Sequence, residues 1–77
     1  MTGLKKIKGD WYMTYATMKG WSYVNTKTNK TVHVRNHNNK WYVFKGGKTA
    51  TLKQIIRSGK SFDTPMRALM YATELMN

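Results

Sequence analysis

The first half of the chain alternates between short apolar segments and polar breaks. Four segments, at 11–17, 21–26, 31–36 and 40–45, are rich in β-branched and aromatic residues. The breaks between them contain glycine or asparagine, which accept the positive φ angles of hairpin turns. This pattern predicts an antiparallel meander of three or four strands.

The period of the apolar positions changes after residue 48. Leu52, Ile55 and Ile56 have the i, i+3, i+4 spacing of one helix face. Thr51 and Gln54 fit a capping box, and Gly59 stands at a C-cap position. We therefore expect a short helix at about 52–58.

The chain closes with a longer helical pattern. Thr64 is a suitable N-cap, Pro65 fits the first helical position, and the sequence is apolar nearly all round as far as Met76. Such a helix should be buried. The chain is thus predicted to have an α+β fold, with the short helix and the C-terminal helix on one face of the sheet.

Strand register can be inferred from the faces that it creates. Pairing Tyr15 with Tyr23, Tyr23 with Val34, and Val34 with Trp41 uses turns of plausible length and separates two sets of side chains. The predicted core face contains Trp11, Met13, Tyr15, Trp21, Tyr23, Val32, Val34, Trp41 and Val43. The opposite face, predicted to be exposed, contains Tyr12, Thr14, Ser22, Val24, His33, Arg35, Tyr42 and Phe44.

The length predicts one small α+β domain at 9–77, preceded by a flexible basic arm at 1–8. A core of this size leaves about 3–5 kcal/mol of net stability, and the absence of cysteine excludes disulfides. The start has no secretory signal pattern, and no later segment has the apolar length of a membrane span. We expect a cytoplasmic protein without a cofactor.

Charge is the strongest compositional feature. The chain has a formal net charge of +11, with only three carboxylates. Residues 1–48 contain ten basic side chains and one carboxylate, so the first part of the chain is the predicted binding surface. Such a charge attracts polyanions over a Debye length of about 8 Å at physiological salt.

Basic and aromatic side chains together suggest nucleic-acid binding. Lysines contact phosphates, and exposed rings stack on unpaired bases. The predicted function is non-catalytic, with RNA or single-stranded DNA slightly preferred over duplex DNA; alternatively, the lysines only solvate an exposed sheet whose rings pack against the arm or another subunit. The methionine-rich stripe of the C-terminal helix is predicted to belong to the core, with a partner helix or a homodimer contact as the alternatives. The candidate contact residues are Lys27, Lys30, His33, Arg35, Lys40, Tyr42, Phe44, Lys45, Lys48, Lys53 and Arg57.

Catalysis and metal binding are disfavoured. His33, His37 and Lys40 could in principle perform acid–base chemistry on RNA, but one histidine lies on a strand and the other in a turn, so nothing makes them converge. Two histidines and three carboxylates are too few for a convincing metal cage. We expect neither an enzyme nor a metalloprotein.

The segment "SFDTPMRALMYA" has the pattern F-x-T-x-x-x-A at Phe62, Thr64 and Ala68. At the entry to a helix that follows aromatic-rich strands, it resembles the sheet-plus-helix DNA-binding domains of phage integrase amino-terminal segments and of the AP2 class. In those families the exposed sheet face enters the DNA major groove, which here implies Ser22, His33, Arg35 and Tyr42. This chain departs from the pattern in an extra first strand and an inserted segment at 49–60.

The chain also resembles the small basic proteins with which phages act on host machinery. That resemblance implies a competing function: an inhibitor in the host cytoplasm that binds a host nuclease, toxin or polymerase, with RNA as a possible bridge.

Overall fold

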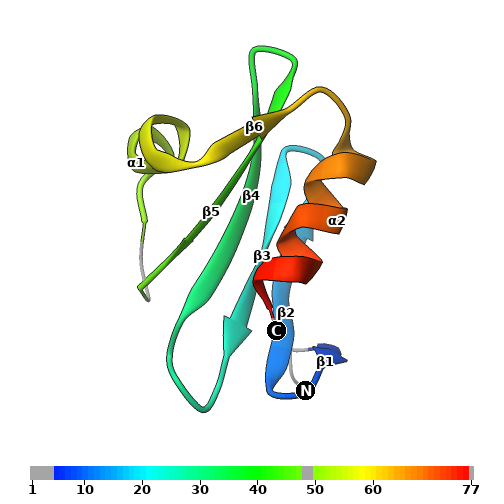
Figure 1. Cartoon of the computed structure of the whole chain (residues 1–77), viewed down its shortest axis with the longest axis vertical. Coiled ribbons are helices and arrows are strands. Elements are labelled where there is room, and N and C mark those ends of the chain that lie inside the picture. The colour runs from blue at the N-terminus through cyan, green and yellow to red at the C-terminus, as the bar shows by residue number, and fades with distance from the viewer. Residues whose placement is uncertain (1–4, 48–49, 77) are drawn as a thin grey trace.

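The fold is a six-stranded antiparallel sheet with two helices, seen in a computed structural model that describes residues 5–47 and 50–76 (Figure 1). The strands follow one another across the sheet in sequence order, so every hairpin joins neighbours. The prediction of an α+β meander with a short helix before a C-terminal helix is confirmed. The elements are β1 (Lys5–Lys8), β2 (Trp11–Thr17), β3 (Gly20–Asn25), β4 (Thr31–His37), β5 (Lys40–Gly46), α1 (Leu52–Ser58), β6 (Lys60–Phe62) and α2 (Pro65–Leu75).

Two edge strands, β1 and β6, were not expected. Lys8 pairs with Trp11 across a turn at Gly9 and Asp10, where Gly9 has the positive φ (57°) that glycine permits. Residues 5–8 therefore belong to the sheet and not to a separate basic arm; residues 1–4 lie outside the described residues. Strand β6 pairs Phe62 with Trp41 on the opposite edge.

The asparagines of the turns have the conformations that their sequence positions suggested. Asn38 and Asn39 both have positive φ (53° and 65°) in the turn that joins β4 to β5, and His37 pairs with Lys40 across them. This is the backbone conformation that a two-residue hairpin loop requires. Asn29 has φ 62° in the longer turn between β3 and β4.

The predicted register is wrong by two residues at Tyr23 and Val34, whereas the faces predicted for β3, β4 and β5 are correct. Tyr23 pairs with Met13 and Val32, and Val34 pairs with Val43. Because side chains alternate along a strand, a shift of two residues changes the partners but leaves each side chain on its face. In β2 a bulge between Met13 and Tyr15 shifts the pairing by one further residue, so that Tyr15 pairs with Ser22 of the opposite face, contrary to its predicted place on the core face.

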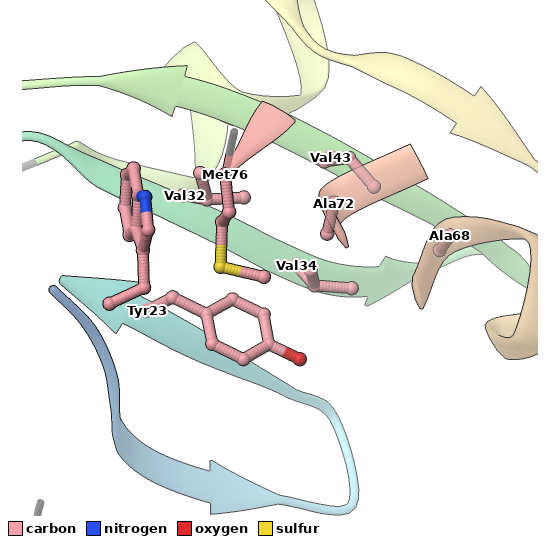
Figure 2. Packing of buried hydrophobic residues seen from close by; sticks show 8 residues of the cluster. Tyr23, Val32, Val34, Val43, Ala68, Ala72 and Met76 are labelled. Atoms are coloured by element: carbon pink, nitrogen blue, oxygen red, sulfur yellow. The ribbon is translucent and has the colours of Figure 1, made fainter. Parts of the chain in front are cut away.

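The core lies between α2 and the predicted aromatic face of the sheet. Ala68 and Ala72 are fully buried and bring α2 close to the strands, where they join a cluster with buried aromatic and valine side chains. Figure 2 shows Met76 pointing from the end of α2 toward Tyr23. The buried members of the cluster are Trp11, Tyr23, Val32, Val34, Val43, Ala68, Ala72 and Met76.

The short helix α1 lies on the other side of the sheet, contrary to the expectation that both helices share one face. It packs on β4 and β5, and Figure 1 shows α1 and α2 on different sides of these strands. Ile55 is buried outside the main core cluster. Thr51 caps the helix as predicted, accepting a hydrogen bond from the amide of Gln54 at 3.2 Å. The polar face of the sheet is therefore partly covered.

Helix α2 is less buried than its composition suggested. Thr64 and Pro65 begin it as expected, with the Thr64 hydroxyl accepting from the amide of Arg67 at 3.2 Å. Its alanines face the sheet, but Met66 and Met70 point to solvent with about two thirds of their surface exposed. No helix within residues 5–47 and 50–76 is long and apolar enough to cross a membrane.

Candidate nucleic-acid interface

Lysines from three separate segments converge at one end of the sheet. This end, called the turn end below, contains the β1–β2 turn, the β3–β4 turn, the last residues of β5 and the C-terminus of α2. Between them lies an open groove of about 530 Å³, called the basic groove. Its lining residues are Lys8, Gly9, Asp10, Trp11, Asn25, Thr28, Lys30, Lys45 and Met76.

The β3–β4 turn holds Lys27 and Lys30 through Asn25. The Asn25 side-chain oxygen accepts hydrogen bonds from the amides of Lys27 and Thr28, both at 2.9 Å. The Asn25 amide donates to the carbonyl of Lys30 at 2.8 Å, and its carbonyl accepts from the amide of Asn29 at 2.8 Å. This asparagine turn fixes the backbone from which both exposed lysines project.

Lys45 contributes to the groove from β5 and also secures α2. Its Nζ donates to the carbonyl of Leu75 at 3.0 Å and lies 6.0 Å from the centre of the Trp11 ring. The last carbonyls of a helix carry partial negative charge, so the ammonium group is favourably placed. Lys45 therefore has a structural role in addition to its positive charge.

His33 is buried, so the prediction that it contacts a ligand from an exposed face is wrong. Only 7 % of its surface is accessible, and both ring nitrogens have protein partners. Nδ1 lies 3.0 Å from the Ser22 hydroxyl, and Nε2 lies 2.9 Å from the Thr31 hydroxyl. The ring is thus part of a buried polar chain beneath the α1 side of the sheet.

The hydrogen bonds of this polar chain define the protonation of His33. Thr31 donates its proton to the carbonyl of Gly47, so its oxygen must accept from His33 Nε2. Nδ1 is then the acceptor for Ser22, whose oxygen accepts from Arg35 Nη2 at 3.0 Å. Burial, and secondarily the nearby Arg35 charge, lower the pKa of His33, which favours this neutral form.

Acidification should therefore destabilise the protein through His33. Because the pKa of His33 is lowered in the folded state, the unfolded chain binds a proton first as pH falls. The stability from neutral His33 is complete above the unfolded pKa of about 6.5 and is lost as pH falls below it. Urea unfolding at pH 8, 7, 6 and 5 should give midpoints that decrease below pH 7.

A matched variant, His37→Gln, should show the same decrease, because His37 lies at the end of β4 and outside the polar chain. Urea midpoints that stay constant or rise between pH 7 and pH 5 would contradict the role assigned to His33.

The other predicted residues of the sheet face are only partly accessible. Arg35 is half-buried, and its Nη1 donates to the carbonyls of Trp21 and Val34 at 2.7 and 2.8 Å. Tyr42 and Phe44 are also half-buried. They pair with Arg35 and His33 of β4 and therefore lie on the same face of the sheet. This face is therefore less open to bases than the sequence suggested.

The remaining predicted cations lie away from the turn end. Lys40 begins β5 at the opposite end and pairs with Asp63, with 3.3 Å between Nζ and Oδ1. Lys53 and Arg57 are exposed on α1, across the sheet from α2. Lys48 lies outside the described residues. Of the predicted lysines, Lys30 and Lys45 line the basic groove, and Lys27 lies in the same turn as Lys30.

Sequence reasoning missed four polar residues of the groove: Lys8, Asp10, Asn25 and Thr28. Lys8 was assigned to the arm because the Gly-Asp pair after it was not recognised as a two-residue hairpin turn, although Gly-Asp between two strand patterns is such a signal. Asn25 and Thr28 carry no charge and have no signal of their own beyond their turn composition.

No group of three or more metal-ligating side chains occurs within the part of the chain that the structure describes. Comparison with known proteins found no matching family model, no matching curated protein and no matching solved structure. The resemblance to the phage integrase amino-terminal and AP2 classes therefore stays a prediction, and the function has to be argued from the chemistry of the surface.

Proposed function

We propose that this is a non-catalytic nucleic-acid-binding protein that holds a phosphate backbone at its turn end. The observation that carries the proposal is the basic groove, where Lys8, Lys30 and Lys45 meet from three segments with Asp10 as the one carboxylate among the lining residues. Lysines that converge in this way, on a chain of net charge +11, favour a polyanion over a single small anion.

Binding would draw its free energy mainly from counterion release. Each phosphate that a lysine neutralises releases condensed cations, so affinity should fall steeply with salt. Asn25 and Thr28 add neutral groups of the kind that commonly hydrogen-bond phosphate or sugar oxygens. The groove supplies affinity without an evident means of reading base sequence.

The preference between single strands and duplex rests on Tyr42 and Phe44. Stacking on unpaired bases requires ring faces to be reached, and both side chains are half-buried near α1. We therefore assign the larger part of the affinity to phosphate contacts and only a smaller part to stacking. RNA or single-stranded DNA remains the slightly preferred ligand in this proposal.

The test is equilibrium binding of nuclease-treated protein to single-stranded RNA, single-stranded DNA and duplex DNA of matched length over a series of salt concentrations. Replacing Lys27 and Lys30 by glutamine should weaken binding to each ligand. It should also make the slope of log K against log salt shallower by about 1.4–1.8, since two phosphate contacts are removed. Both lysines are exposed, so the fold should persist.

The matched control removes the same charge from the other side of the sheet, as Lys53→Gln with Arg57→Gln on α1. This control should change the slope far less. Equal slopes for the two double variants would place binding elsewhere than the turn end. If the unmodified protein bound none of the three nucleic acids at physiological salt, the proposed function would be wrong.

A further inference from the structure

The side of α2 that faces away from the sheet displays apolar side chains to solvent. Met66, Leu69 and Met70 expose 66 %, 39 % and 61 % of their surfaces. Their i, i+3, i+4 spacing makes them neighbours on one side of the helix. These three residues are called the α2 stripe. Contiguous exposed apolar surface of this kind is typical of an interaction site.

A shallow groove runs beside the α2 stripe. It has a volume of about 330 Å³ and is lined by Phe62, Arg67, Met70, Tyr71 and Glu74. The Phe62 and Tyr71 rings pack against each other with centroids 5.2 Å apart, which gives the groove an apolar floor. Arg67 and Glu74 are both exposed along this groove, and Lys60 Nζ lies 5.3 Å from the centre of the Tyr71 ring, so two cations stand against one carboxylate.

This combination suits a helical partner. An amphipathic helix presents apolar anchors at i, i+3, i+4 and i+7, which can lie along the α2 stripe and insert a side chain beside Phe62 and Tyr71. Methionines adapt their shape to such anchors, because their side chains are unbranched and flexible. A carboxylate next to an anchor would meet the Arg67 guanidinium at the rim.

The net charge of the chain favours a partner that is negatively charged. A second copy of the chain would bring another net charge of +11 to the contact. An acidic partner gains attraction from the same charge that repels a second copy.

We propose that the α2 stripe and its adjoining groove bind an acidic amphipathic helix of a partner protein. This site lies on the α2 side of the sheet, whereas Lys27 and Lys30 project from the β3–β4 turn at the turn end. The protein would then join a nucleic acid to a second protein. The proposal does not depend on the nucleic-acid function, because different residues carry it.

The test uses synthetic peptides of about 20 residues, long enough to form a helix. One has leucines at helical spacing and glutamates on its other side; a second has the same composition in scrambled order; a third has lysine in place of each glutamate. Fluorescence anisotropy with the full chain at physiological salt should show binding of the acidic amphipathic peptide. The scrambled and basic peptides should bind much more weakly.

Variants locate the contact. Met66→Gln with Met70→Gln should weaken binding of the acidic amphipathic peptide about tenfold or more, as expected for central anchors. The matched control is Leu52→Gln, since Leu52 is 46 % exposed on α1, across the sheet. Arg67→Gln should weaken binding more than Arg57→Gln, which removes the same charge from α1. Neither Leu52→Gln nor Arg57→Gln should weaken peptide binding tenfold.

Three results would overturn the proposal. The first is binding of the acidic amphipathic peptide that is unchanged in the Met66→Gln, Met70→Gln variant. The second is equal binding of the scrambled peptide. Either result would mean that the peptide binds through net charge alone. The third is a dimer of the parent chain in sedimentation equilibrium that becomes a monomer in the same double variant. That result would show that the α2 stripe binds a second copy of the chain. Unchanged nucleic-acid binding by this variant would show that the two sites are separate.

Discussion

Replacing Tyr23 by alanine should leave a large fraction of the protein unfolded at 25 °C. Tyr23 is 1 % exposed at the centre of the core cluster, opposite Met13 and Val32, and Figure 2 shows Met76 directed toward it. Truncating a buried aromatic side chain to alanine costs about 3–5 kcal/mol. A domain of this size has about 3–5 kcal/mol of net stability, so the loss is comparable with the whole.

Circular dichroism and urea unfolding would measure this effect. Tyr12→Ala is the matched control, because it removes the same side chain from the half-buried opposite face of β2. Tyr12→Ala should retain a cooperative transition with a smaller decrease in midpoint. A Tyr23→Ala protein with a near-normal unfolding midpoint would contradict the position of Tyr23 in the core.

Gly59→Ala should also be strongly destabilising, for a steric reason. A Cβ atom at Gly59 would lie 2.3 Å from the carbonyl oxygen of Ile55 and 2.7 Å from that of Val43. Both are backbone atoms, so either the last turn of α1 or strand β5 must move. Overpacking of this kind costs about 1–3 kcal/mol, and each kcal/mol lowers the melting temperature of such a domain by about 4–8 °C.

Gly47→Ala provides the control, since a Cβ atom there would meet nothing within 4 Å. Thermal unfolding should separate the two variants, with Gly47→Ala within about 0.5 kcal/mol of the parent chain. Equal melting temperatures for both variants would show that α1 does not press on β5 at Gly59.

At Gly59 the sequence predicted the end of the helix but not the reason why glycine is required there. Its position after α1 was correctly read as the end of the helix, and its amide donates to the carbonyl of Ile55 at 2.8 Å. Its φ of −80°, however, is not the left-handed conformation of a typical glycine cap. Glycine is needed because two backbone segments approach there, and such tertiary proximity has no local sequence signal.

The two faces of the sheet were predictable, whereas the pairing of residues between neighbouring strands was not. Alternation assigned Trp21, Tyr23, Val32 and Val34 to one side without knowledge of register. The exact pairing depends on the bulge in β2 and on turn lengths, and errors of two residues leave no trace in the alternation. The placement of α1 was equally hidden, because its apolar side matches either face.

The candidate site was predictable in charge but not in geometry. Lys30 and Lys45 were recognised as cations, yet their convergence with Lys8 depends on the antiparallel order that brings two turns and the end of β5 to one end of the sheet. His33 was misplaced because a polar residue on a strand was taken as exposed. Its burial depends on Ser22 and Thr31 satisfying both ring nitrogens, which only the folded arrangement reveals.

The sequential order of the strands has a consequence for how the chain folds during synthesis. Each strand pairs with one already made, so the meander from β1 to β5 can form while the rest of the chain emerges. Ala68, Ala72 and Met76, which complete the core, are synthesised after these strands. Until α2 docks, the nascent sheet presents Trp11, Tyr23 and its valines uncovered, which makes this late interval the period when aggregation or chaperone capture competes with folding.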